Sequence, residues 1–189
     1  MATKSQSSAD SIYQLKITLR DIKPPIWRRV QVKSNITLAQ LHDVIQATMG
    51  WEDYHLHQYE KDGIYYGLPE QNYDYEILNE KRFKLNSILT SENEKLDYEY
   101  DFGDSWQHTI ELEKILAPEP NEKYPVCLAG KRACPPEDCG GIWGYEDLIE
   151  ALRDPDHPEH EDMLEWAGED FDPEYFEVDE VNEQLKFIK

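Results

Sequence analysis

The chain has 189 residues, a formal net charge of −21 and an aromatic content of 12%. This length is typical of one domain, and the aromatic residues can build a core that a disordered acidic chain would lack. The sequence holds no apolar run of membrane-spanning length, no phosphate-binding or dinucleotide-binding glycine motif, no HExxH and no GxSxG. It therefore gives no support for a membrane span, nucleotide hydrolysis, dinucleotide binding, a zinc protease of the HExxH type or a serine hydrolase with a GxSxG elbow.

The first eleven residues are small and polar, and we expect them to form a disordered leader rather than a secretory signal. The chain contains three cysteines, an odd number that suits a reducing compartment better than a framework of disulfides. Together these features predict a cytoplasmic protein that does not enter a membrane.

Elements of the N-terminal portion follow from apolar spacing. Apolar and polar residues alternate over residues 13–19, which predicts a strand, and a Pro-Pro turn leads to a second strand over residues 27–32. Thr37 is a suitable N-cap for a helix over residues 38–49, and Gly50 ends the helical pattern. This strand-strand-helix opening is compatible with a β-grasp-like core.

The middle of the chain predicts further strands. Residues 55–59 and 64–66 flank an Asp-Gly turn and predict a strand pair, and residues 67–80 resemble a loop. Residues 83–89 suggest a short connecting element. A second strand pair is predicted over residues 96–100 and 107–115.

The C-terminal portion predicts helices. Residues 118–141 form a loop rich in Pro, Gly and Cys, and apolar residues at helical spacing follow from Tyr145 to Leu152. Two more helices are predicted, one from Pro158 to near Trp166 and one over residues 178–188.

The order of these elements predicts an α+β fold, because strands and helices are segregated along the chain. We expect an antiparallel or mixed sheet with one packed N-terminal helix and a C-terminal helical portion. The expected organisation is a leader over residues 1–11 and a single domain over residues 12–189. Within that domain residues 12–117 form mainly sheet, residues 118–141 form the loop, and residues 142–189 form the acidic helical portion.

Acidic residues are concentrated near the C-terminus. Residues 137–183 contain 19 acidic residues and one basic residue, whereas residues 1–60 are close to neutral. A solvated acidic surface is the simplest interpretation, and a docking face for a basic protein partner is the alternative. Direct binding of nucleic acid by this half is disfavoured, because no basic stripe is available to meet phosphates.

Two histidines form the first candidate site. If residues 55–59 are a strand, His55 and His57 project from the same face together with Tyr59. Two neutral imidazoles on one face can bind a divalent metal or relay protons. The alternative is a partly exposed polar strand face beside aromatic packing.

The second candidate site lies in a turn with aromatic flanks. Asp101 and Asp104 are three residues apart, and two carboxylates at this spacing can chelate a metal or act as an acid/base pair. Ordinary turn chemistry is the alternative, because Asp is favoured in turns. His108 shares its predicted strand face with Trp106, and we expect it to be a core histidine held by one hydrogen bond.

Three cysteines form the last candidate site. Cys127, Cys134 and Cys139 are separated by six and four residues, which is not a standard zinc knuckle. A zinc site would need a fourth ligand, such as His157 or His160. The alternative is that the cysteines are small buried residues in a rigid loop.

Four strings of the sequence, taken together, resemble the plasmid pRiA4b ORF-3-like family. They are Pro24-Pro25-Ile26-Trp27-Arg28-Arg29-Val30; Leu41-His42-Asp43-Val44-Ile45-Gln46 with Met49-Gly50-Trp51 and His55-Leu56-His57; Tyr100-Asp101-Phe102-Gly103-Asp104-Ser105-Trp106 with His108; and Tyr124-Pro125-Val126-Cys127, Gly130 and Cys134-Pro135-Pro136-Glu137-Asp138-Cys139-Gly140-Gly141 with Gly144-Tyr145. The resemblance runs from about residue 12 to the C-terminus. It implies an association with mobile elements, since some members carry a resolvase label, but it attaches no firm reaction to the chain.

These observations favour a non-enzymatic interaction or ligand-binding module that serves a DNA-linked system through a protein partner. The alternative is a metal-dependent hydrolase that uses the His/Asp or Cys residues, with a divalent ion such as zinc as its cofactor. A DNA-binding recombinase is the third hypothesis, and the acidity of the chain argues against it.

Overall fold

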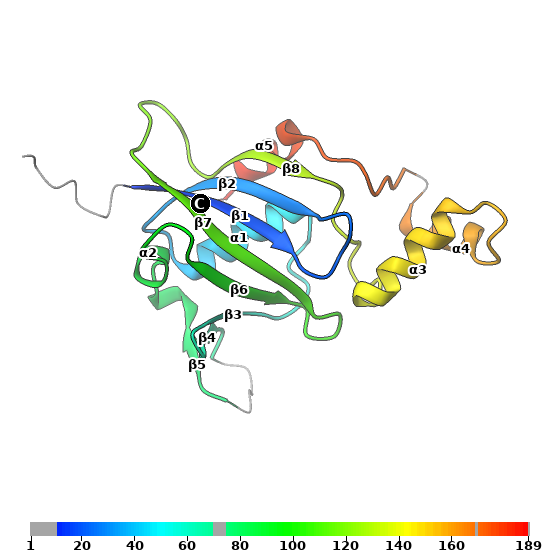
Figure 1. Ribbon diagram of the computed structural model, residues 1–189, viewed down its shortest axis with the longest axis horizontal. Helices are drawn as coiled ribbons and strands as arrows, with labels where there is room; N and C mark the ends of the chain where they lie inside the picture. Colours follow the sequence, from blue (N-terminus) through cyan, green and yellow to red (C-terminus); the bar gives the residue numbers. More distant parts are fainter. Residues whose placement is uncertain (1–10, 70–74, 169, 189) are drawn as a thin grey trace, which may run out of the picture.

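A computed structural model describes residues 11–69, 75–168 and 170–188. The predicted leader therefore lies, apart from Ser11, outside the described residues. The fold is α+β: an eight-stranded mixed sheet has the strand order β5-β4-β3-β6-β7-β1-β2-β8, and helices α1 and α5 pack on one side of it (Figure 1).

The first two strands form the predicted hairpin. Strand β1 (Ile12–Leu19) pairs antiparallel with β2 (Trp27–Lys33), and the register of the pair places Leu15 opposite Val30. Most apolar side chains of the two strands are buried on the face that α1 covers, together with Arg28, which donates to the Thr48 carbonyl of α1. Lys16 and Arg29 lie on the other face, over the ring of Trp27. The alternation in the sequence thus defines the two faces, as expected for a sheet with one packed face.

Helix α1 (Leu38–Met49) has the predicted bounds. The Thr37 side chain accepts a hydrogen bond from the Gln40 N–H, and the Gln40 side chain accepts one from the Thr37 N–H, which is a complete capping box. Gly50 ends the helix with a φ of 87°, a left-handed conformation that glycine adopts without strain. The stripe of Leu38, Leu41 and Ile45 is fully buried against the sheet.

The strands that follow α1 differ in part from the prediction. Strand β3 (His57–Lys61) begins two residues later than expected, so His55 lies in the loop before it. Strand β4 (Ile64–Gly67) pairs antiparallel with β3 and parallel with β5 (Ile77–Asn79), which lies in the segment predicted to be a loop. A 3₁₀ turn, η2 (Glu80–Arg82), and helix α2 (Leu85–Ile88) complete this connection.

The second predicted strand pair is present as β6 (Lys95–Tyr100) and β7 (Trp106–Leu116). Strand β8 (Val126–Lys131) was not predicted, because it lies inside the Pro/Gly/Cys segment. It pairs with β2 at the edge of the sheet, and an edge strand tolerates nearby proline and glycine.

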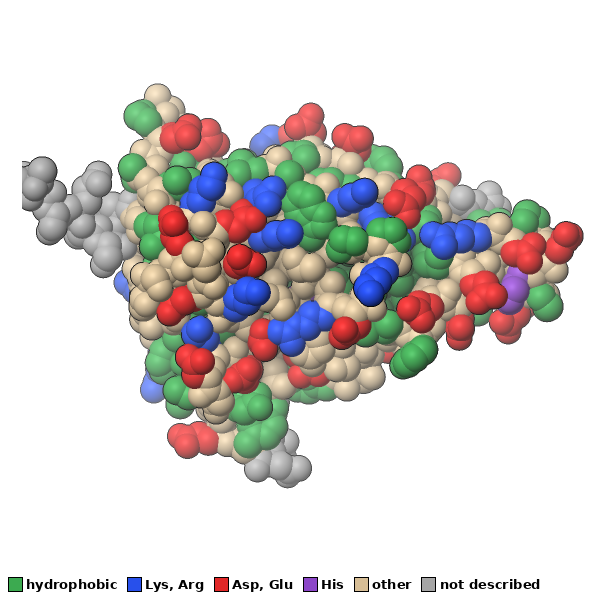
Figure 2. All heavy atoms as spheres, in the orientation of Figure 1, with side chains coloured by type: hydrophobic (Ala, Val, Ile, Leu, Met, Phe, Trp, Pro, Cys, Tyr) green, Lys and Arg blue, Asp and Glu red, His purple; other side chains and the backbone are tan. Residues whose placement is uncertain are grey.

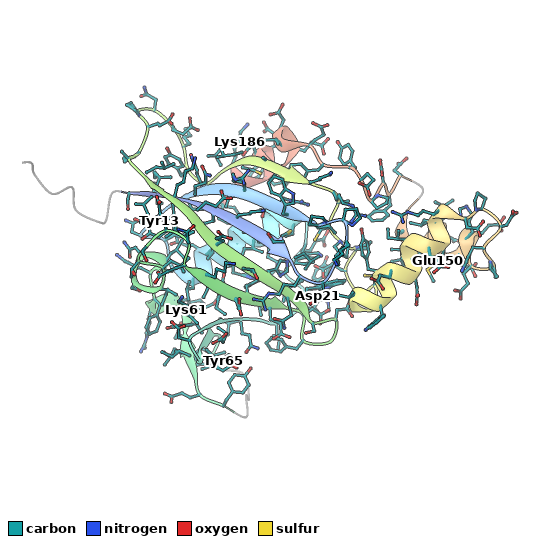
Figure 3. All side chains as sticks on the ribbon, viewed as in Figure 1. Tyr13, Asp21, Lys61, Tyr65, Glu150 and Lys186 are labelled. Atoms are coloured by element: carbon teal, nitrogen blue, oxygen red, sulfur yellow. The ribbon has the colours of Figure 1, made fainter. Side chains whose placement is uncertain are left out.

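The three C-terminal helices are α3 (Gly141–Arg153), α4 (His160–Ala167) and α5 (Val178–Leu185). Helix α5 ends earlier than predicted and contacts α1 and β8. Helices α3 and α4 extend away from the end of the sheet (Figure 1), and Glu150 on α3 lies beyond the β1–β2 turn that carries Asp21 (Figure 3).

The face of the sheet opposite α1 is polar. Lys and Arg side chains are interspersed with Asp and Glu on this face (Figure 2), and several form ion pairs, including the two-point contact of Arg29 with Glu113. Among the described residues no helix has both the length and the apolarity needed to cross a bilayer.

Candidate functional site

The candidate site lies at the end of the sheet where β6 turns into β7. Three segments meet there: the loop between α1 and β3, the β6–β7 turn, and the loop that precedes α3. Several hydrogen bonds join them. For example, the Trp51 indole N–H donates to the Pro135 carbonyl at 3.0 Å, the Asp101 N–H to the Leu56 carbonyl at 2.8 Å, and the Gly140 N–H to an Asp104 carboxylate oxygen at 3.1 Å.

His55 is the centre of this site, and its ring faces three carboxylates. The distance from its Nε2 atom is 3.1 Å to Asp138 Oδ1, 3.7 Å to Asp101 Oδ2 and 3.8 Å to Glu137 Oε2. Although Asp138 is close, its position does not give a hydrogen bond to His55 Nε2. Both His55 Nε2 and Glu137 Oε2 are buried atoms without a hydrogen-bond partner among the described residues.

Each of the two more buried carboxylates has one oxygen tied to the protein and the other directed at His55. Asp101 Oδ1 accepts the Gly103 N–H at 2.9 Å, which leaves Oδ2 toward the histidine. Glu137 Oε1 accepts the Tyr100 hydroxyl and the Glu52 N–H, each at 3.0 Å, which leaves Oε2 toward the histidine. The hydrogen bonds thus orient free oxygens toward one point.

The spacing of these atoms suits a single divalent ion. Ligand atoms about 2.1 Å from one ion, at angles of 90–110°, lie roughly 3.0–3.4 Å from each other. One ligand atom from each of His55, Asp101 and Asp138 lies within 4.8 Å of the other two. Glu137 is not in this group, but its Oε2 lies 3.8 Å from His55 Nε2. The site can therefore hold a metal ion after only small adjustments of the side chains.

Tyr100 connects the parts of the site. Its buried hydroxyl donates to Glu137 and accepts the Tyr54 N–H at 3.1 Å, so it ties the loop of His55 to the loop of Glu137. Burial, followed by the hydrogen bond to the Glu137 carboxylate, raises the pKa of Tyr100 well above its ordinary value. The hydroxyl therefore keeps its proton and remains a donor to Glu137.

A second group of possible ligands consists of His42, Asp53 and His57. The His42 and His57 rings are stacked, with centroids 3.5 Å apart and planes 6° from parallel. An imidazole nitrogen binds metals in the plane of its ring, and an ion shared by two parallel rings would lie out of both planes. The stacking therefore disfavours a shared ion.

The imidazole nitrogens of this second group are hydrogen-bonded to other side chains of the protein. His42 Nδ1 lies 2.8 Å from the Tyr98 hydroxyl and its Nε2 lies 2.9 Å from Asp53, while His57 Nε2 lies 2.8 Å from the buried Glu80. Buried polar groups that satisfy each other in this way are a common structural network. We interpret this group as a support for the loop that carries His55.

The structure separates the histidines that the sequence analysis placed on one face. The prediction that His55 and His57 project together is wrong, because the strand begins at His57 and its alternation does not reach His55. His57 points into the core beside His42, whereas His55 faces Asp101.

The other predicted residues, Asp104 and His108, lie outside both groups of possible ligands. Asp104 accepts a backbone N–H from Gly140 and belongs to neither group of possible ligands. His108 is the expected core histidine, with Nδ1 2.9 Å from the Trp106 carbonyl oxygen, and burial lowers its pKa to about 3.

None of the three cysteines belongs to a group of possible metal ligands among the described residues, and all three are free thiols. Burial raises the pKa of each thiol, which disfavours the thiolate that a metal would bind.

Sequence reasoning missed Glu137 and Asp138 as possible ligands. Both lie in the string that was selected for its cysteines, and their acidity was attributed to the solvated C-terminal surface. Their place beside His55 depends on contacts between residues more than 80 positions apart. A pattern of local spacing carries no signal for such contacts.

Comparisons with known proteins agree with the fold. The family described as plasmid pRiA4b ORF-3-like protein matches residues 11–180. An uncharacterised protein y4hQ from Sinorhizobium fredii (strain NBRC 101917 / NGR234) is 38% identical over 177 residues, which cover 93% of this chain and 91% of that protein. The crystal structure of a protein of unknown function, MM3350 from Methanosarcina mazei Go1, is 48% identical with a TM-score of 0.84, covering 90% of this chain and 97% of that one. This chain belongs to the plasmid pRiA4b ORF-3-like family.

Proposed function

We propose that this member of the plasmid pRiA4b ORF-3-like family is a ligand-binding protein whose site is built on one divalent metal ion held by His55, Asp101, Glu137 and Asp138. One observation carries the proposal: two buried ligand atoms without hydrogen-bond partners, His55 Nε2 and Glu137 Oε2, face each other 3.8 Å apart among carboxylate oxygens. Three further buried atoms of the described residues also lack a partner, Trp106 Nε1, His108 Nε2 and Tyr145 Oη, but none of these residues belongs to a group of possible metal ligands.

The energetics support an ion at this point. A buried polar group left without a partner costs about 1–3 kcal/mol, and carboxylates that face one another also repel. A divalent cation offsets both costs at once. The resulting ligand set combines one imidazole with carboxylate oxygens, which suits ions such as Zn²⁺ or Mn²⁺.

One side of the site is open to solvent. The side chain of Asp138 is 71% exposed, whereas those of His55, Asp101 and Glu137 are mostly buried. The three buried groups would hold the ion, and the exposed Asp138 carboxylate could give up its place to a further ligand. Three protein groups with one open position are typical of metal sites that accept a further ligand, so this arrangement supports ligand binding and also suits the alternative function, a metal-dependent hydrolase.

The proposal is tested by isothermal titration of metal-free protein with ZnCl₂ and MnCl₂. We expect one ion per chain for the wild-type protein and a loss of at least about 100-fold in affinity for His55→Gln, because loss of a ligand should exceed the 10- to 100-fold effect of outer-shell changes. His157→Gln is the matched control, since His157 lies on the segment between α3 and α4 and should not change binding. Equal affinities of His55→Gln and wild-type protein would rule the proposal out.

A further inference from the structure

The first observation concerns the charge of the site. The three carboxylates outweigh the two positive charges of the ion, so the occupied site remains negative. Across the part of the chain that the structure describes, no lysine or arginine forms an ion pair with Asp101, Glu137 or Asp138. An anionic ligand such as phosphate would therefore meet an uncompensated negative field.

The second observation concerns the surroundings of the open side. Tyr54, which precedes His55, has 70% of its surface exposed, and Phe102, which follows Asp101, has 37% exposed. The Tyr54 hydroxyl is hydrogen-bonded to the Glu52 carboxylate, and the Glu52 N–H donates to Glu137. Two exposed aromatic residues thus adjoin His55 and Asp101 in the chain, on two different segments of the site, and Tyr54 is linked through Glu52 to Glu137.

We infer that the ion takes its further ligand from an uncharged nitrogen heterocycle, and this inference rests on the proposed metal site. A neutral ring nitrogen is a good donor to borderline divalent ions and adds no negative charge. The ring that carries it can stack on Tyr54 or Phe102, because aromatic rings prefer offset or edge-to-face contacts with each other. The same chemistry is offered by a free heterocycle and by a histidine side chain of a protein partner.

The test uses the full chain loaded with Co²⁺, whose visible absorption reports a change of ligands. Three probes are added in separate titrations: benzimidazole, an acetylated and amidated histidine peptide, and inorganic phosphate. We expect the two heterocycles to change the spectrum at concentrations at least about tenfold below that of phosphate. Tighter binding of the peptide would identify a protein side chain as the source, and tighter binding of benzimidazole a free heterocycle.

The aromatic contribution is tested with Tyr54→Ala. We expect it to weaken heterocycle binding to the Co²⁺-loaded protein by about two- to tenfold, and Co²⁺ affinity, which is measured separately, to fall by less than this. Tyr175→Ala is the control, because Tyr175 is also an exposed tyrosine bonded to a glutamate, Glu180, but this glutamate belongs to neither group of possible ligands.

Phosphate binding as tight as that of the heterocycles would overturn the inference, and so would a Tyr54→Ala variant that binds them like the wild type. In both cases the metal site itself would stand. A protein that develops no Co²⁺ spectrum would instead overturn the proposed function, and this inference with it.

Discussion

Replacing Tyr100 by phenylalanine removes one oxygen atom from the support of the metal site. The lost hydroxyl is the donor to Glu137 Oε1 at 3.0 Å and the acceptor of the Tyr54 N–H at 3.1 Å. Glu137 would keep only the Glu52 N–H on that oxygen, so its other oxygen would no longer be fixed toward His55. The ring of Tyr100 is fully buried, and phenylalanine fills nearly the same volume.

The expected size of the effect follows from these contacts. Loss of an outer-shell partner lowers metal affinity by about 10- to 100-fold, which equals roughly 1.4–2.7 kcal/mol. The metal-free protein should lose about 1–3 kcal/mol of unfolding free energy, because the Tyr54 N–H loses its acceptor and Glu137 Oε1 loses one of its two donors. The loss of metal affinity and the loss of unfolding free energy can therefore be measured separately.

The assay is a titration of metal-free protein with Zn²⁺, combined with urea denaturation. Tyr59→Phe is the matched control, because Tyr59 is equally buried but its hydroxyl donates to the Leu38 carbonyl. We expect Tyr59→Phe to lose stability and to keep its metal affinity. The reasoning is refuted if Tyr100→Phe binds Zn²⁺ as tightly as the wild type, or if both variants lose affinity equally.

Two further predictions concern the fold. In the folded protein the pKa of His108 is lowered to about 3, whereas in the unfolded chain His108 takes up a proton near pH 6.5. The contribution of neutral His108 to stability is therefore fully present above pH 6.5 and is lost as the pH falls toward 3. Between pH 7 and pH 4.5, urea denaturation should therefore show a loss larger by roughly 3 kcal/mol in the wild type than in His108→Gln; equal losses would contradict this. A Cβ atom at Gly144 would lie 1.9 Å from the Cys139 carbonyl oxygen, so Gly144→Ala should lower stability by at least about 1–3 kcal/mol, and an unchanged melting temperature would count against this packing.

Local rules were sufficient for elements whose signals lie within a few residues. Helix α1 has its cap at Thr37, its apolar stripe and its terminal Gly50 all within 14 consecutive residues, and its predicted bounds are confirmed. The predicted hairpin of β1 and β2 is also confirmed by their antiparallel pairing. Its signal was the alternation of apolar and polar residues along the chain. In both cases burial reinforces what the local sequence favours.

Prediction failed where a neighbouring strand decides the structure. Strand β8 lies among proline and glycine residues, and it forms because the edge of β2 is available for pairing. The expected alternation from His55 to His57 failed for a related reason: β3 starts only where Tyr100 of β6 pairs with His57. Which residue begins a strand depends on a partner about 40 residues away.

The candidate site was likewise predicted only in part, because local sequence identifies some of its residues and contacts between distant residues identify the others. His55 and Asp101 were selected for their chemistry, and the structure brings these two together. Glu137 and Asp138 were not selected, because the acidic segment that follows offers many equivalent carboxylates. Their distinction comes from the Trp51 bond to Pro135 and the Tyr100 bond to Glu137, which only the folded chain makes.

The most direct measurement is anomalous diffraction at the zinc absorption edge from crystals of the protein grown with Zn²⁺. The metal-site proposal predicts one dominant peak per chain about 2.0–2.2 Å from His55 Nε2, between the free oxygens of Asp101, Glu137 and Asp138. A dominant peak at the cysteines or at the His42–His57 pair, or none beside His55, would contradict it.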